Sequence, residues 1–122
     1  MSISDAEAVV MEVLWERHPL GADEVVAALA HSDWAEPTIK TLLNRLLNKG
    51  VIQAAKDGRR YLYSPVLARE AWIAQQSEGL VQRLFGGRVA PLVAHFSHQG
   101  ALSKADIAEL RKLLEEIDDD PA

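Results

Sequence analysis

Apolar residues in the first half of the chain recur at the spacing of short amphipathic helices. Ser4-Asp-Ala-Glu7 has the form of a capping box and predicts a helix over about residues 4–17. After a Leu20-Gly21 connector, a second helix is predicted from about Asp23 to Ala30. A third helix should run from Glu36 to Gly50, where glycine ends it. Its buried face consists of five residues at helical spacing: Ile39, Leu42, Leu43, Leu46 and Leu47.

Two extended runs follow this third helix. Val51–Ala55 and Arg60–Ser64 flank the segment Lys56-Asp-Gly-Arg59. An Asp-Gly pair between two extended runs is a strong signal for a β-hairpin. The order of three helices and a hairpin over residues 4–65 is typical of a winged helix-turn-helix. The second helix of its helix-turn-helix enters the major groove of DNA.

The second half of the chain has helical patterns and no strand signal. We expect a long helix over about residues 67–85, a short one around Val89–Phe96 and a third that Ser103 caps. In the last helix, apolar residues from Ile107 to Ile117 alternate steps of three and four, as in a coiled-coil seam. Glu115–Asp120 is expected to be a solvated acidic tail.

Three short helices can hardly bury their apolar stripes without a partner surface. We therefore predict a mainly α fold with a winged helix-turn-helix head at 1–65 and a three-helix dimerisation tail at 66–122. The alternative is that the tail packs onto the head of the same chain. The predicted dimerisation residues are Leu80, Leu84, Leu92, Phe96, Leu110, Leu114 and Ile117.

The distribution of charge supports a DNA-binding head. The whole chain of 122 residues has a net charge of −5, but the segment from Pro37 to Arg60 has six basic residues and one acid. A local basic face can attract a polyanion even on an acidic protein. The alternative is that these side chains only solvate a surface.

Composition excludes several other classes of functional site and fits one location in the cell. The chain has no cysteine, which excludes a disulfide framework, a thiol nucleophile and a thiolate metal site, and fits a cytoplasmic location. Its first residues do not have the pattern of a signal peptide, and no apolar run has the roughly 18 residues that a membrane span needs.

Short polar and basic side chains occupy the face of the third helix opposite its apolar stripe. The predicted DNA contacts of this helix are Thr38, Lys40, Thr41, Asn44, Arg45 and Lys49, and those of the hairpin are Lys56, Arg59 and Arg60. The threonines suit hydroxyl or thymine-methyl contacts, Lys40 can reach guanine or phosphate, and Asn44 can pair with adenine. Arg45 and Lys49 are better suited to phosphate, and the hairpin to the DNA backbone or the minor groove. Trp34, just before the helix, can either contact phosphate or pack against the core.

Several motifs in their order resemble the penicillinase-repressor (BlaI/MecI) family of winged-helix regulators, which includes the CopY copper repressors. In the head they are Ile3–Glu7, Val13–Trp15, Ala22–Val25, Trp34, Thr38–Leu43, Arg45-Leu46, Lys49-Gly50, Gly58-Arg59 and Tyr61–Pro65. In the tail they are Phe85–Gly87, Leu92-Val93 and Leu110–Leu114. The resemblance thus extends over nearly the whole chain.

The resemblance implies a homodimeric repressor on an inverted-repeat operator. It places the recognition helix at Thr38, Lys40, Thr41 and Arg45, and the wing at Gly58-Arg59. It also implies release by proteolysis in the tail, through a membrane sensor protease or a protease downstream of it. The scissile Asn-Phe bond of the family aligns with His95-Phe96, so that His replaces Asn. Copper sensing through a cysteine cluster is excluded because the chain has no cysteine.

Three other function classes are alternatives to a DNA-binding repressor. An enzyme is not expected, because His95 and His98 have no nearby acid to complete a metal site and the chain has no nucleophile elbow or glycine-rich phosphate loop. We expect no cofactor and no metal. A second class is a regulator that binds a small molecule between head and tail, near Trp72, Leu84 and Phe85. A third is a winged helix that makes only protein contacts.

Overall fold

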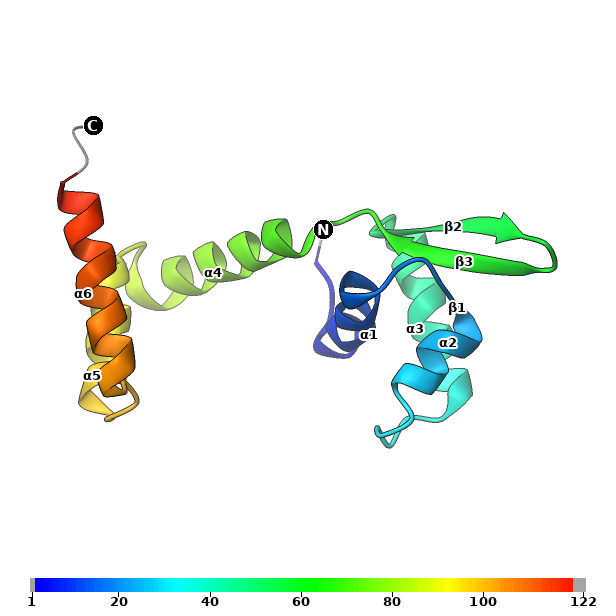
Figure 1. The fold of residues 1–122 in the computed structure, drawn as a ribbon, viewed down its shortest axis with the longest axis horizontal. Coiled ribbons are helices and arrows are strands. Elements are labelled where there is room, and N and C mark those ends of the chain that lie inside the picture. The colour runs from blue at the N-terminus through cyan, green and yellow to red at the C-terminus, as the bar shows by residue number, and fades with distance from the viewer. Residues whose placement is uncertain (1, 120–122) are drawn as a thin grey trace. The chain divides into compact units, whose positions relative to one another are not determined.

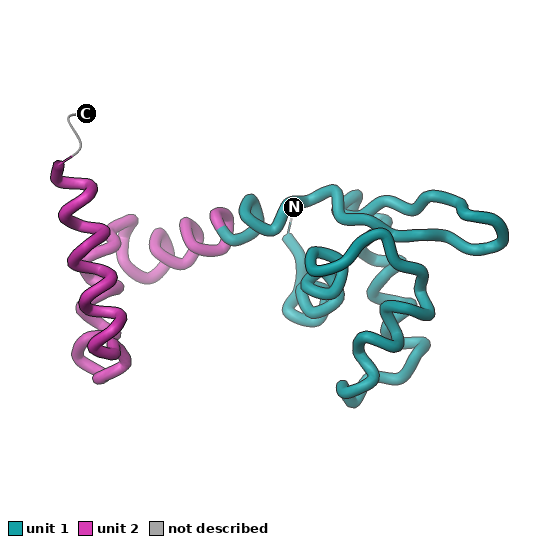
Figure 2. The backbone as a smooth tube through the Cα atoms, in the orientation of Figure 1, with its two compact units in different colours: residues 1–73 teal, residues 74–122 magenta. Residues whose placement is uncertain are grey.

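The computed structural model describes residues 2–119 and contains six helices and a three-stranded antiparallel sheet in that range (Figure 1). The elements are α1 (Asp5–Glu16), β1 (Leu20–Gly21), α2 (Ala22–Ala28), α3 (Glu36–Lys49), β2 (Ile52–Asp57), β3 (Arg60–Pro65), α4 (Arg69–Phe85), α5 (Val89–His98) and α6 (Lys104–Asp118). This is the mainly helical winged-helix fold that the sequence predicts. Contacts divide the chain into two compact units, Met1–Ile73 and Ala74–Ala122 (Figure 2).

The first unit contains a closed apolar core between α1, α2, α3 and the sheet. Its buried members are Ile3, Val10, Met11, Leu14, Leu20, Val25, Leu29, Ile39, Leu42, Leu43, Leu46, Val51 and Ile52. Four of the five apolar residues predicted for α3 are buried there, and Leu47 is partly buried against them. The amphipathic pattern of α3 therefore fixes which of its faces turns outward.

Local signals set the ends of the helices as the sequence predicts. The Ser4 hydroxyl accepts a hydrogen bond from the Glu7 backbone N–H at 3.1 Å, and the Glu7 carboxylate accepts one from the Ser4 N–H at 2.7 Å. Pro37 lies in the first turn of α3, where a missing N–H costs no helical hydrogen bond. Gly50 ends α3 with φ of 75°, a left-handed conformation that favours glycine.

The sheet contains one strand that the sequence did not predict. Leu20-Gly21, predicted to be a connector, forms β1 and pairs with β3 through Leu20 opposite Tyr63 and Gly21 opposite Leu62. The strand order is β1-β3-β2, so β3 is central. A two-residue strand has no alternation for a pattern to detect, and its partner lies far along the chain.

The hairpin of β2 and β3 extends from the helices as a wing (Figure 1). Its turn differs from the expected one, because Asp57 pairs with Arg60 and leaves Gly58 and Arg59 as the loop. Gly58 has φ of 64°, and all residues with positive φ in the described range are glycines. Glycine at the first loop position is typical of a type II′ turn, which matches the twist of the strands.

The first unit continues beyond Pro65, the end of the predicted head, to Ile73. The Trp15 indole N–H donates to the Leu67 carbonyl at 2.8 Å, and the rings of Trp15 and Trp72 lie 5.4 Å apart at 37°. These contacts attach the first turn of α4 to the head. Pro65 ends the strand but does not end the compact unit.

The second unit contains the rest of α4 together with α5 and α6. Glycines with positive φ, Gly86 and Gly87, separate α4 from α5, and Ser103 caps α6 through a capping box with Asp106. The acidic residues Glu115, Glu116, Asp118 and Asp119 are exposed, as expected for a solvated acidic end, and the first three belong to the last turn of α6; Asp120 lies outside the described residues. None of the described residues of α4, α5 and α6 is buried. Within residues 2–119, no helix combines the length and apolar character needed to cross a membrane.

Candidate nucleic-acid interface

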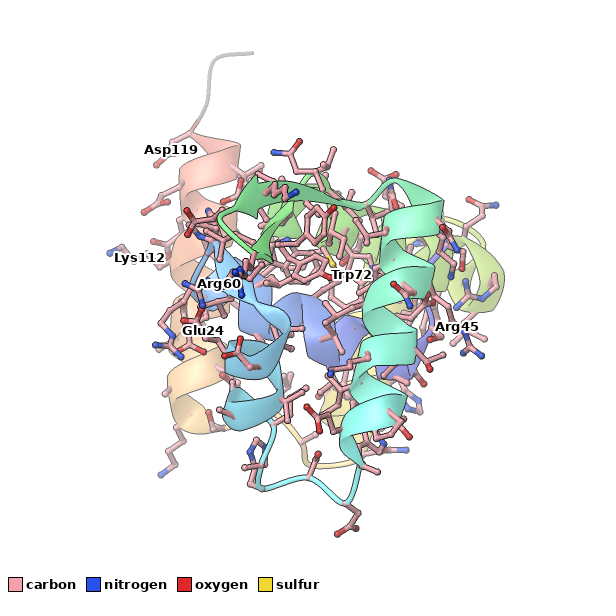
Figure 3. All side chains as sticks on the ribbon, turned by 90° about the vertical axis from the view of Figure 1, so that its right-hand side faces the viewer. Glu24, Arg45, Arg60, Trp72, Lys112 and Asp119 are labelled. Atoms are coloured by element: carbon pink, nitrogen blue, oxygen red, sulfur yellow. The ribbon has the colours of Figure 1, made fainter. Side chains whose placement is uncertain are left out.

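The outer face of α3 presents the predicted base-reading side chains together. Thr38, Lys40, Thr41, Asn44 and Arg45 are all exposed, while the opposite face of the helix is in the core. Arg45 projects away from the helix in Figure 3. Side chains of this size on one helical face can reach base edges and phosphates of a major groove.

Two residues on this face make contacts within the helix itself. Lys40 Nζ lies 3.4 Å from Glu36 Oε1, one turn earlier, and both side chains are about half exposed. Such a surface pair is weak and leaves the ammonium able to turn toward an anion. The Thr41 hydroxyl donates to the Pro37 carbonyl at 2.9 Å, so its methyl group and its oxygen lone pairs remain for an outside partner.

The wing presents three basic side chains in two different situations. Lys56, near the turn, and Arg59, in the turn, are exposed. Arg60 Nη1, by contrast, lies 3.1 Å from Glu24 Oε1 (Figure 3). Arg60 therefore links the start of β3 to α2. Arg45, Lys56 and Arg59 form no ion pair with the residues that the structure describes. Their charges are the ones most available to phosphate.

Lys49 differs from the other predicted contacts because it points back into the protein. Its ammonium donates to Glu7 Oε1 at 2.5 Å and to the Ser2 carbonyl at 3.1 Å. Sequence reasoning identified Glu7 through the capping box but missed this pairing. The two residues are 42 positions apart, and no local pattern connects them.

Trp34 is half-buried and packs against the core of the first unit. Its backbone N–H donates to the Ser32 hydroxyl at 3.3 Å, within the turn that precedes α3. This is the packing role that the sequence left open. Trp34 therefore contributes to the placement of the loop between α2 and α3.

The predicted dimerisation residues lie on the helices of the second unit, and five of them are exposed: Leu80, Leu84, Phe96, Leu114 and Ile117. Leu92 and Leu110 are half-buried. His95 and Phe96 are consecutive in α5, with ring centroids 5.5 Å apart, and the His95 ring lies 6.4 Å from that of Phe85. The predicted cleavage bond is thus inside a helix.

The structure places the residues of the expected ligand pocket in different surroundings. Trp72 packs on Trp15 in the first unit, whereas Leu84 and Phe85 belong to the second. A groove of about 770 Å³ does open on the first unit. It is lined by α1, the end of α2, His31 and Arg69, and none of the three expected residues contributes to it.

Comparison with known proteins decides the family. The family model described as penicillinase repressor matches residues 3–116. This chain belongs to the penicillinase-repressor family. The penicillinase repressor of Bacillus licheniformis is 36% identical over 115 residues, which cover 93% of this chain and 90% of the relative. The methicillin resistance regulatory protein MecI of Staphylococcus aureus (strain N315) is 30% identical over 113 residues, which cover 92% of each chain.

A solved relative in the penicillinase-repressor family is similar in both sequence and fold. The solution structure of monomeric B. licheniformis BlaI in complex with the blaP half-operator has a TM-score of 0.52 and 36% identity to this chain. The match covers 58% of this chain and 88% of the BlaI chain. The sequence-based resemblance to this family is thereby confirmed.

Proposed function

We propose that this chain is a transcriptional repressor that binds a specific inverted-repeat operator as a homodimer. The observation that carries the proposal is the exposed polar and basic face of α3, followed directly by a basic wing, in a member of the penicillinase-repressor family. A relative with this fold is a repressor seen with its half-operator. Repression follows because a bound dimer occludes the promoter.

The side chains divide between reading bases and holding the backbone. Thr38, Lys40, Thr41 and Asn44 on α3 read base edges in the major groove. Arg45 and the wing bases Lys56 and Arg59 neutralise phosphates and so fix the register without selecting a sequence. Arg60, paired with Glu24, holds the turn end of β3 to α2 and contributes its remaining donors to the DNA backbone.

The second unit supplies the dimer. Its apolar residues Leu80, Leu84, Phe96, Leu114 and Ile117 are exposed in the single chain, and a second copy can cover them by a twofold axis. Two recognition helices related by that axis would enter successive major grooves about 34 Å apart. An operator with two inverted half-sites matches this symmetry.

Cleavage between His95 and Phe96 would inactivate such a dimer. The cut separates α6, with Leu110, Leu114 and Ile117, from the rest of the chain. The partner would be a membrane sensor protease or a protease that it activates. Mass spectrometry of the chain from cells under inducing conditions should find a fragment that ends at His95; an intact chain released from DNA would exclude this route.

The experiment that tests the proposal is selection of bound DNA from a random duplex library, followed by affinity measurements over a salt series. We expect an enriched inverted repeat whose affinity falls steeply as salt rises, because phosphate contacts release counterions. Salt-sensitive binding without enrichment would contradict sequence-specific recognition. No binding at any salt concentration would favour a winged helix that makes only protein contacts.

Two matched variants separate the proposed roles. Thr41→Ala should cost on the order of 1–3 kcal/mol of operator affinity and relax one base position. Arg59→Ala should weaken all sequences alike and reduce the salt slope by about 1. A change of base preference with an unchanged slope in Arg59→Ala would make the wing a reader of sequence.

A further inference from the structure

The first turn of α1 and the last turn of α3 are joined by a small network, which we call the Glu7 clasp and define as Ser2, Ser4, Glu7 and Lys49. Glu7 Oε1 accepts both the Ser4 backbone N–H at 2.7 Å and the Lys49 ammonium at 2.5 Å. Lys49 also donates to the Ser2 carbonyl at 3.1 Å. One lysine thus holds the N-terminal segment and α1 to the end of the recognition helix.

Glu7 is nearly inaccessible to solvent, with 2% of its surface exposed, and Oε2 has no hydrogen-bond partner among the described residues. Burial alone raises the pKa of Glu7, but the hydrogen bonds from Lys49 and Ser4, together with the charge of Lys49, bring the pKa below its ordinary value. The carboxylate is therefore ionised in the folded protein at neutral pH. A buried charge of this kind depends strongly on its partner.

The Lys49 ammonium is committed to this network, and only a third of its side chain is exposed. Arg45, one turn earlier on the same helix, projects outward and forms no ion pair with any described residue. The two bases of α3 that were both expected to bind phosphate are therefore in different situations. The end of the helix that carries Lys49 is fixed by Gly50 and by the clasp.

We propose that Glu7 and Lys49 are positioning residues that hold α3 in its DNA-reading placement, and that Lys49 neutralises Glu7 rather than a phosphate. This inference rests on the proposed DNA-binding function. Its rival is that Lys49 turns to the DNA backbone and Glu7 only competes for it. The two hypotheses predict opposite changes in operator affinity for one substitution. Glu7→Gln weakens operator binding if the clasp positions α3, but strengthens it if Glu7 withholds Lys49 from phosphate.

The first experiment measures the salt dependence of operator binding for full-length wild type, Lys49→Met and, as matched control, Arg45→Met. Each phosphate neutralised adds about 0.9 to the slope of log affinity against log salt. We expect Arg45→Met to lose roughly that amount. Lys49→Met should keep the wild-type slope while the ratio of operator to non-specific affinity falls about tenfold. An equal loss of slope in both variants would overturn the proposal.

The second experiment measures operator affinity for Glu7→Gln and for the double variant Glu7→Gln with Lys49→Met. We expect Glu7→Gln to bind the operator more weakly than wild type, and the double variant to be no weaker than the worse single variant, because both act through one contact. Tighter binding by Glu7→Gln overturns the inference. If Glu7→Gln does not fold, the slope of Lys49→Met still decides.

A measurement without DNA separates this inference from the proposed function. Carbon NMR of the Glu7 carboxyl should show that Lys49→Met raises its pKa, because burial is then no longer offset by the ammonium. If wild type binds no duplex DNA, the proposed function fails. The Glu7 titration then still tests whether Lys49 neutralises Glu7. An unchanged Glu7 pKa in Lys49→Met would overturn the inference.

Discussion

Leucine side chains in the two compact units have opposite environments. In Met1–Ile73, Leu14 and Leu46 have no exposed surface, whereas in Ala74–Ala122, Leu84 is 66% and Leu114 63% exposed. Both units have helices with apolar stripes, but only the first buries those stripes in a closed core. The difference indicates that the first unit owes its stability to its own core, and that the second depends on a further apolar surface.

The largest effect is expected from charges placed on the apolar stripe of α6 in the second unit. Leu110→Asp with Leu114→Asp should yield monomers in light scattering, because a buried carboxylate pair opposes association. Operator affinity should fall roughly 10²–10⁴-fold, since the two half-sites are no longer bound by one linked particle. Leu14 and its neighbours are untouched, so the thermal transition of the first unit should persist. A monomer that still binds the operator tightly would contradict the assignment of dimerisation to this unit.

A cavity in the first unit tests the other side of the comparison. Leu46→Ala removes a fully buried side chain of α3 and should lower the free energy of unfolding by about 2–5 kcal/mol, because of lost apolar burial and the cavity left behind. Urea denaturation should give the same loss at every protein concentration. Leu114→Ala is the control, since its effect should act through association and vary with protein concentration. Concentration dependence in Leu46→Ala would mean that the first unit is not self-sufficient.

The sequence predicted best those features that local pattern determines. Helix α3, its Gly50 end and the two capping boxes at Ser4 and Ser103 each depend on residues within one or two turns. The exposed face of α3 follows directly from its buried one. Most of the predicted interface is therefore a consequence of amphipathic spacing.

The features that the sequence missed depend on partners that are distant along the chain. Strand β1 exists because β3 pairs with Leu20-Gly21, and Lys49 turns inward because Glu7 lies beside it in space.

Acid should affect the first unit through Glu7. The lowered pKa means that the fold favours the carboxylate, so its contribution to stability is complete above the ordinary glutamate pKa of 4.5. It is lost as pH falls through the lower folded value. Urea denaturation from pH 7 to pH 3 should therefore show a shallower acid loss for Glu7→Gln than for wild type. Glu78→Gln, at an exposed position of the second unit, should keep the wild-type profile; a parallel change there would contradict this assignment.

The smallest expected effect concerns the start of α4, where the first unit ends. The Trp15 indole N–H donates to the Leu67 carbonyl, while the Trp72 indole N–H is buried without a partner among the described residues. Trp15→Phe and Trp72→Phe remove similar ring area, but only the first removes a hydrogen bond and leaves a carbonyl unpaired. Trp15→Phe should therefore lose about 1 kcal/mol more in urea denaturation than Trp72→Phe. Equal losses would mean that the tether between α1 and α4 is the stacking of the two rings alone, and the boundary at Ile73 would then depend on packing rather than on the hydrogen bond to Leu67.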